Sequence, residues 1–208
     1  VRVNMFYPSE YKVSDTITVT QSGNFYADQK TLFTVKGSGQ FTLALRLPDW
    51  ANGNITIKIN GAVQSVTATN GYYEINHDWS DGDTVGYSVP FSFRLVALKG
   101  SKNKNAIFYG PLLFVADLGD DDVHDVQESQ VNFGKPYTGD IGNKIVFEED
   151  WQNNTQVVAD ADGNISFVLH TRNQGDITFR PFNQVFHSRY GMYFEIYDTV
   201  ADAEYDYT

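Results

Sequence analysis

Carboxylates are the most abundant side chains in this sequence that could carry out chemistry. The chain has 26 Asp and Glu residues, and Glu148-Glu149-Asp150 is one of its two runs of three. Ordinary glycoside hydrolysis uses two carboxyl groups that face each other across a sugar. With so many acids, however, some pair lies close by chance, and a run of three is typical of a solvated loop. We therefore predict no catalytic residue in this chain.

Thiol chemistry is excluded because the chain has no cysteine. It can form neither a disulfide nor a zinc–thiolate site, and it holds no cysteine nucleophile. The four histidines, His77, His124, His170 and His187, are scattered, and no two have the spacing of a ligand pair such as His-x-x-x-His. This pattern is typical of surface or hydrogen-bonding histidines, so we predict no metal ligand and no cofactor within the chain.

One segment is similar to the start of a calcium-binding loop. Asp160-Ala161-Asp162-Gly163-Asn164 places acidic residues at alternate positions. Its glycine comes too early, however, and Thr171 stands where such a loop needs a bidentate glutamate. A turn is the favoured interpretation, while a structural calcium ion at another loop stays open.

Sugar binding is the surface function that the aromatic residues favour. A flat ring can cover the C–H face of a sugar while neighbouring amides form hydrogen bonds. Trp151 precedes Gln152-Asn153-Asn154. Tyr72 and Tyr73 must point to opposite faces of a strand, so one of them is expected to be exposed or to contact another domain. Trp151, Asn153 and Tyr72 are therefore candidate carbohydrate-binding residues. The alternative for Trp151 is that it covers the core of its own domain.

The elements that must position these side chains are strands. Residues Phe41–Leu47 and Ile55–Ile59 alternate apolar residues with others, and a period of two indicates half-buried strands. Asn60-Gly61 and Asn70-Gly71 suit the positive φ angles of tight hairpins, and Asp81-Gly82-Asp83 marks a further turn. This succession predicts an antiparallel sheet that forms half of a sandwich.

Composition and charge limit the classes of partner. The net charge is −11 and the pI is about 4.6, which argues against nucleic acid and against an anionic membrane surface. No apolar run approaches the roughly 20 residues that a membrane span needs. Hydrophobic residues make up 41% of the chain, which is ample for a packed core.

Two domains are predicted, with a boundary in the polar window Lys99–Asn105. The alternative is that this window is a long hairpin loop inside one domain. Since no window has a period of 3.6 residues, we predict an all-β fold of two consecutive antiparallel β-sandwiches of jelly-roll type, residues 1–100 and 101–208. Asp117–Asn143 is expected to be a surface excursion, and the acidic tail Thr199–Thr208 is expected to be loose.

Several short motifs, in order along nearly the whole chain, carry a resemblance to a known family. They include Leu-Arg-Leu-Pro-Asp-Trp-Ala at 45–51, Gly71-Tyr72-Tyr73, Tyr109-Gly110-Pro111-Leu112 and Pro181-Phe182 followed by Arg189-Tyr190. Together they resemble the C-terminal β-sandwich region of glycoside hydrolase family 127, which contains β-L-arabinofuranosidases. Tyr109 stands where the family often has Arg, so the resemblance identifies neither subfamily nor substrate.

The resemblance implies that the chemistry lies outside this chain. In family 127 the active site sits in an α/α barrel, with a cysteine nucleophile beside a zinc ion held by cysteines and a glutamate. The chain would be a fragment without that N-terminal barrel, and zinc is expected only there. The implied setting is carbohydrate degradation by a secreted or periplasmic bacterial protein. Candidate partners are the barrel, an oligosaccharide and a second copy of the chain.

A barrel would need a docking face, which we predict around Phe6 and Trp50. Met5-Phe6-Tyr7 are three consecutive apolar or aromatic residues, and a strand can bury only alternate ones in its own sandwich. Phe6 or its neighbours should therefore face a partner. Two function classes remain: a non-catalytic region that supports the barrel, and an autonomous carbohydrate-binding module.

Overall fold

The computed structural model describes residues 1–101, 103–119, 142–186 and 188–205, and the chain divides into two compact units. Unit 1 comprises Val1–Phe91 and unit 2 comprises Ser92–Thr208. The division therefore lies between Phe91 and Ser92, not near residue 100. Strand β11 (Phe93–Ala97) pairs along its whole length with β12 (Lys104–Tyr109), so the polar window between them is a hairpin connection inside unit 2. Polar residues suit an exposed hairpin as well as they suit a linker.

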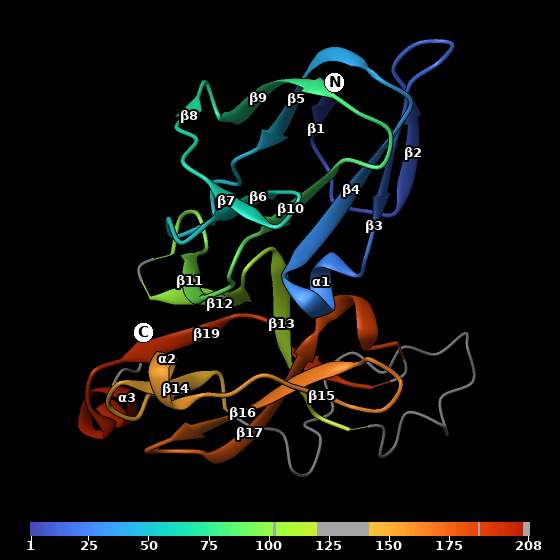
Figure 1. The fold of residues 1–208 in the computed structure, drawn as a ribbon. Coiled ribbons are helices and arrows are strands. Elements are labelled where there is room, and N and C mark those ends of the chain that lie inside the picture. The colour runs from blue at the N-terminus through green and yellow to red at the C-terminus, as the bar shows by residue number, and fades with distance from the viewer. Residues whose placement is uncertain (102, 120–141, 187, 206–208) are drawn as a thin grey trace. The chain divides into compact units, whose positions relative to one another are not determined.

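Strands dominate both units, which confirms the all-β prediction (Figure 1). The α-helices among the described residues have four to six residues each: α1 (Phe25–Asp28), α2 (Trp151–Asn154) and α3 (Val200–Tyr205). A short 3-10 turn, η1, spans Phe182–Gln184.

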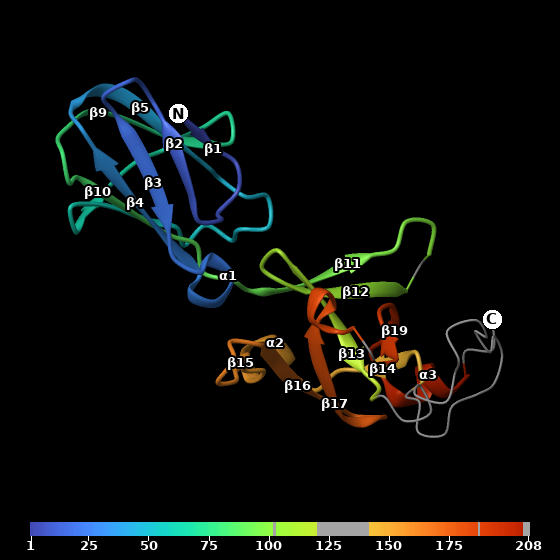
Figure 2. The same ribbon diagram turned by 90° about the vertical axis from the view of Figure 1, so that its right-hand side faces the viewer.

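Unit 1 contains two sheets (Figure 2). The order of the six-stranded sheet is β2 (Ser9–Lys12), β3 (Thr18–Ser22), β4 (Lys30–Lys36), β10 (Thr84–Ser88), β6 (Thr56–Ile59) and β7 (Ala62–Gln64). The order of the four-stranded sheet is β1 (Arg2–Val3), β5 (Gly39–Arg46), β9 (Tyr72–Trp79) and β8 (Ala68–Thr69). All pairs in unit 1 are antiparallel except β1 with β5.

The hairpins predicted at Asn60-Gly61 and Asn70-Gly71 are confirmed, but the prediction of one antiparallel sheet is wrong: β5 and β9 belong to the four-stranded sheet, and β6 and β10 belong to the six-stranded sheet. Asn60 and Gly61 have φ angles of 48° and 82° between β6 and β7, and Asn70 and Gly71 have 52° and 79° between β8 and β9. Positive φ at both central residues gives the turn whose twist matches the flanking strands. These two turns therefore fix the register of their hairpins.

The two sheets of unit 1 meet through Tyr87 on β10. Its side chain is 1% exposed, and its hydroxyl donates a hydrogen bond of 2.7 Å to the carbonyl of Arg46 on β5. Its ring centroid lies 6.3 Å from that of Tyr73 on β9. Leu43 and Leu45 on β5 are fully buried, as their alternation predicts. The core of unit 1 thus lies between the sheets.

The strands in the described part of unit 2 belong to one hydrogen-bonded sheet. Besides β11 and β12 they are β13 (Leu112–Asp117), β14 (Lys144–Val146), β15 (Val158–Ala159), β16 (Ile165–Thr171), β17 (Gly175–Pro181), β18 (Tyr190–Gly191) and β19 (Phe194–Tyr197). The order is β14-β19-β12-β13-β17-β16-β15, with β11 on β12 and β18 on β13. Two separate sheets are not seen among the described residues of this unit, so the jelly-roll sandwich is not confirmed there.

An aromatic cluster forms the core of unit 2. Phe167 lies 4.9 Å from Phe114 and stacks on Phe179 at 5.1 Å, and Phe93 meets Phe167 edge to face at 4.9 Å. Each of these four rings is at most 8% exposed. The long apolar runs of the second half of the chain therefore fill a core of their own.

The acidic tail is more regular than its composition suggests. Helix α3 begins after Thr199, whose hydroxyl accepts from the Asp202 backbone N–H at 3.1 Å and donates to the Asp202 carboxylate at 2.6 Å. Ala203 is buried. A Thr followed three residues later by an acid is a capping signal, so the prediction of a loose tail is wrong for Val200–Tyr205.

Candidate functional site

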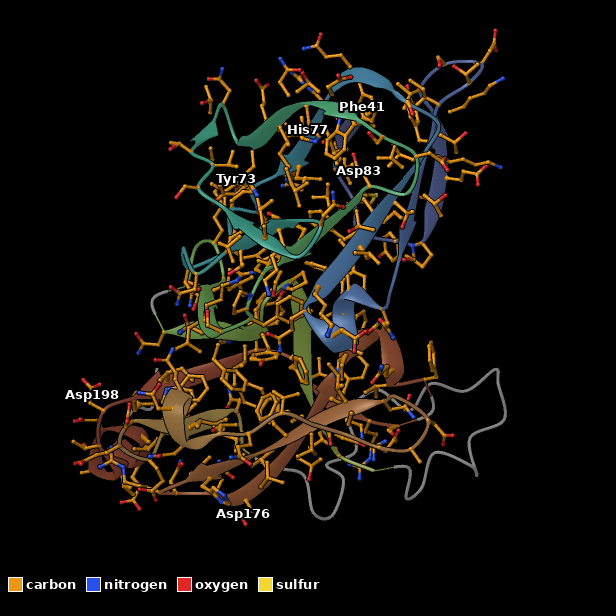
Figure 3. The ribbon with its side chains drawn as sticks, viewed as in Figure 1. Phe41, Tyr73, His77, Asp83, Asp176 and Asp198 are labelled. Carbon is orange, nitrogen blue, oxygen red and sulfur yellow. The ribbon has the colours of Figure 1, made fainter. Side chains whose placement is uncertain are left out.

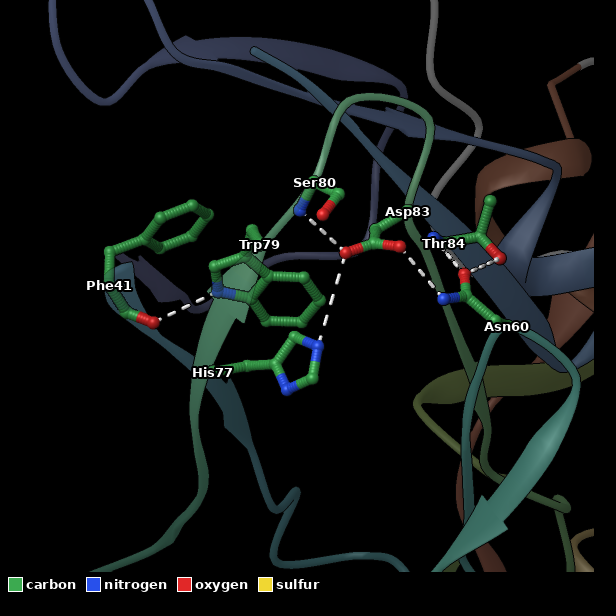
Figure 4. A network of polar contacts seen from close by, with 7 residues as sticks. All are labelled: Phe41, Asn60, His77, Trp79, Ser80, Asp83 and Thr84. Atoms are coloured by element: carbon green, nitrogen blue, oxygen red, sulfur yellow. Dashed lines mark hydrogen bonds and ion pairs between the residues drawn. The ribbon is translucent and has the colours of Figure 1, made fainter. Parts of the chain in front are cut away.

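A network of polar contacts in unit 1 surrounds Asp83, in the turn between β9 and β10 (Figure 4). One carboxylate oxygen accepts from the Ser80 backbone N–H at 2.7 Å, and the other accepts from the Asn60 amide at 2.8 Å. His77 Nε2 lies 4.0 Å from the carboxylate, and the same Asn60 accepts from the Thr84 N–H at 2.8 Å. Asp83 thus ties the β6–β7 turn to the β9–β10 turn.

The electrostatics of this network indicate a structural role. The Ser80 N–H, followed by the Asn60 amide, holds the pKa of Asp83 below its ordinary value because both stabilise the charged form. A depressed carboxyl pKa suits neither a general acid nor a base near neutral pH. Nearby Trp79 is 1% exposed, and its indole N–H donates to the Phe41 carbonyl at 2.9 Å, so Trp79 belongs to the core of unit 1.

The acidic cluster and the calcium-like segment are exposed loops. Glu148, Glu149 and Asp150 all face solvent. Asp160 accepts hydrogen bonds of 2.9 Å from the backbone N–H groups of Asp162 and Asn164, which closes the predicted turn. Hydrogen bonds from Asn164, first from its side chain, lower the pKa of Asp160.

No group of three His, Asp or Glu residues able to hold a metal ion occurs within the described ranges. His170 Nδ1 lies 2.6 Å from Asp176 Oδ1 across β16 and β17, but both side chains are more than half exposed. Figure 3 labels Asp176. His124 and His187 lie outside the described residues.

The predicted carbohydrate-binding residues are divided between the two units. Trp151, in α2 of unit 2, is half-buried and stacks on Phe147 with ring centroids 4.4 Å apart, so the ring covers the core of its own unit. Asn153, also in α2, donates to Asp150 at 2.6 Å. Tyr72 belongs to unit 1, where its hydroxyl donates to the Asn4 side chain at 2.6 Å. A sugar-binding role for these residues stays a prediction.

The predicted docking patch is corrected at Phe6. This side chain is 6% exposed and contacts Phe25 and Tyr87, with ring centroids 4.5 and 5.2 Å apart. Its neighbours Met5 and Tyr7 are 68% and 50% exposed. Met5, Phe6 and Tyr7 lie between β1 and β2 and are not in a strand, so the predicted strand is wrong; Phe6 turns inward while its two neighbours face solvent. Three consecutive apolar residues give no local signal for which of them turns inward.

Trp50 occupies an intermediate position in unit 1. It is half-buried, and its ring meets Phe91 edge to face at 5.1 Å and Phe25 at 6.4 Å. Its exposed part is therefore the remainder of a packed aromatic side chain. A docking role for Trp50 stays a prediction.

One feature escapes the sequence analysis altogether: a groove of about 500 Å³ on the outer face of the six-stranded sheet. Leu32 on β4, Gly86 on β10 and Lys58 on β6 lie in one row across it. The available signal is Gly86, since a glycine between Val85 and Tyr87 interrupts a strand and marks places where another molecule can approach the backbone.

Unit 1 matches a known family model. Residues 1–91 match the family model described as the beta-L-arabinofuranosidase, GH127 middle domain. These residues coincide with unit 1. The model describes a middle domain, whereas the motifs of the sequence led us to expect a C-terminal region. A search of curated proteins found no match.

Three solved structures are similar to nearly the whole chain. A GH127 β-L-arabinofuranosidase from Geobacillus stearothermophilus T6 is 17% identical, with a TM-score of 0.69 over 94% of this chain and 33% of its own. A second GH127 β-arabinofuranosidase is 16% identical, with a TM-score of 0.72 over 97% and 35%. A protein described as a glycoside hydrolase is 16% identical, with a TM-score of 0.65 over 94% and 35%. At this identity the likeness shows the fold alone, and the chain spans about a third of these proteins' length.

No helix in the described part of the chain is long and apolar enough to cross a membrane.

Proposed function

We propose that the chain is a non-catalytic, β-rich region of a glycoside hydrolase similar to β-L-arabinofuranosidases, and that it supports a catalytic barrel of the same protein. The observation that carries this proposal is the match of residues 1–91 to the GH127 middle domain. The length of the similar structures, about three times that of this chain, leaves room for a further catalytic part.

The residues of the chain fit a supporting role. The acidic cluster Glu148–Asp150 is exposed, and the pKa of Asp83 is lowered, away from the range of a general acid. The chain has no cysteine, so the nucleophile and the zinc ligands implied by the family resemblance would have to come from elsewhere in the protein. A secreted or periplasmic location and a dimer stay predictions.

The second candidate is an autonomous carbohydrate-binding module, which the groove on unit 1 favours. A groove of this volume falls within the range of small-molecule sites. Glycan binding by the isolated chain would support this second role, and it is compatible with the first.

The experiment compares two proteins: the 208-residue chain and a longer protein that includes the sequence encoded upstream of it. The isolated chain should not hydrolyse 4-nitrophenyl β-L-arabinofuranoside and should retain no zinc after dialysis. The longer protein should hydrolyse this substrate and should retain zinc. Removing residues 1–208 from the longer protein should lower its unfolding temperature. Turnover by the isolated chain that is lost in Glu148→Gln or Asp83→Asn would overturn the proposal.

A further inference from the structure

The pairing register of the strands determines which residues line the groove on unit 1. The inward residues of β4 and β10 are buried, so Leu32 and Gly86 point to the outer face of the six-stranded sheet. Ser22 pairs with Leu32, Leu32 with Gly86, and Gly86 with Lys58, which makes one row across β3, β4, β10 and β6 (Figure 1). Directly opposed residues on one face are close neighbours.

A second row runs beside the first, one pleat further along the strands. Ser88 on β10 pairs with Lys30 on β4 and with Thr56 on β6. The two rows together line the groove, and each row carries one lysine, Lys58 in the first and Lys30 in the second.

Gly86 leaves the floor of the groove open. A Cβ built at this position would approach only the Lys58 Cβ, at 3.8 Å, which is ordinary van der Waals contact. Its φ lies outside the left-handed region, so the backbone does not require a glycine there. A glycine that the backbone does not need, in the middle of a strand, is explained by the space that it leaves above it.

The groove combines an apolar surface with positive charge. Leu32 is 43% exposed, and the bare backbone at Gly86 continues this surface. Lys30 and Lys58 are exposed and form no ion pair with any residue in the described ranges, while Asp28 contributes one carboxylate to the lining. Two ammonium groups against one carboxylate make the groove positive in a chain with a net charge of −11.

We propose that this groove binds a saccharide that carries carboxylate groups, such as a short uronic-acid oligosaccharide. The apolar C–H face of a sugar ring would lie on Leu32 and Gly86, and its carboxylates would meet Lys30 and Lys58. The Ser88 hydroxyl donates to the Gln29 carbonyl at 3.4 Å and keeps its lone pairs for a sugar hydroxyl. The inference rests on the proposed carbohydrate-related function and adds the chemical class of the ligand.

The test is a calorimetric titration of the full 208-residue chain with tri-galacturonic acid and, in parallel, with its methyl ester. The ester keeps the sugar rings but removes the charges. Tri-galacturonic acid should bind at least about tenfold more tightly than the ester, and its affinity should fall as salt is raised. The expected complex has one ligand per chain.

Matched variants identify the site. The double variant Lys30→Ala/Lys58→Ala should lose about tenfold in affinity, and Gly86→Val should abolish binding because its side chain fills the floor. Lys36→Ala removes one charge from the same face outside the groove, and it should bind as the unchanged chain does. Circular dichroism spectra establish that each variant is folded.

Equal binding of acid and ester, absence of acid binding at millimolar concentration, or unchanged affinity in the double lysine variant would overturn the inference. None of these results touches the proposed supporting role, which depends on hydrolysis and zinc retention. Conversely, hydrolysis by the isolated chain would overturn that role whatever the groove binds.

Discussion

Replacing Phe6 by alanine should be among the most destabilising changes in unit 1. The side chain is 6% exposed and touches Phe25 and Tyr87, with ring centroids 4.5 and 5.2 Å away. Truncating a buried phenylalanine costs about 3–5 kcal/mol, because apolar area is lost and a cavity remains. We expect about 3 kcal/mol, the lower end, since Phe6 lies near the exposed residues Met5 and Tyr7 and the site can partly close.

The loss should be visible as a large fall in the unfolding temperature. For a domain of this size each kcal/mol corresponds to about 4–8 °C, so Phe6→Ala should lower the midpoint of unit 1 by at least roughly 12 °C. Thermal and urea unfolding followed by circular dichroism measure the change. Phe6→Leu, which keeps most of the volume, provides an intermediate value if the alanine variant does not fold.

Met5→Ala is the matched control, because it truncates a neighbouring apolar side chain that is 68% exposed. It should change the free energy of unfolding by less than about 0.5 kcal/mol. If Met5→Ala costs as much as Phe6→Ala, or if Phe6→Ala costs less than about 1 kcal/mol, the assignment of Phe6 to the core of unit 1 is wrong.

Three further changes test the polar and backbone features of unit 1, each by urea unfolding. Tyr87→Phe removes the hydroxyl that donates to the Arg46 carbonyl and should cost about 1–2 kcal/mol at pH 8. Burial raises the pKa of Tyr87 above its ordinary value of 10, so above pH 10 the unfolded state loses a proton that the folded state keeps, and the unchanged chain loses stability. The difference in unfolding free energy between the unchanged chain and Tyr87→Phe should therefore shrink above pH 10. A difference that does not depend on pH would contradict this reasoning. Asp83→Asn should lose less stability on acidification than the unchanged chain does. Hydrogen bonds from Ser80 and then Asn60 depress the pKa of Asp83, so the stability that its carboxylate contributes is lost as pH falls below about 3.8. If the variant loses stability with acid as steeply as the unchanged chain, this prediction is wrong. Gly86→Val should raise stability by about 0.5–1 kcal/mol, because a β-branched residue suits an ordinary strand backbone, and a measured loss would show that the floor of the groove is not open.

The elements that the sequence predicts best are those with a local physical cause. Asn60-Gly61 and Asn70-Gly71 form the predicted turns because few other residue pairs adopt two successive positive φ angles at low cost. The alternation in Phe41–Leu47 predicts β5 because Leu43 and Leu45, two positions apart, share one face of the strand, and both are fully buried. In these segments the local pattern and the tertiary packing select the same conformation.

The features that the sequence does not predict depend on contacts between distant segments. Nothing local distinguishes Phe6 from Met5 and Tyr7; Phe25 and Tyr87 do so by packing against it. The Lys99–Asn105 window has the composition of a linker, and only the pairing of β11 with β12 shows that it lies inside a unit. The groove cannot be predicted from the sequence, because the residues that line it are far apart along the chain and become neighbours only when their strands pair.

The distribution of the tryptophans makes the two units optically distinguishable. Trp50 and Trp79 belong to unit 1, and Trp151 is the third and last tryptophan of the chain. In a Trp50→Phe/Trp79→Phe variant, all indole emission would come from Trp151 in unit 2, whose ring stacks on Phe147. When unit 2 unfolds, water reaches this ring and its emission would shift to longer wavelength. Trp151→Phe would confine the emission to unit 1. A pair of fluorescence melts would then show whether the two halves unfold as one cooperative body or as two.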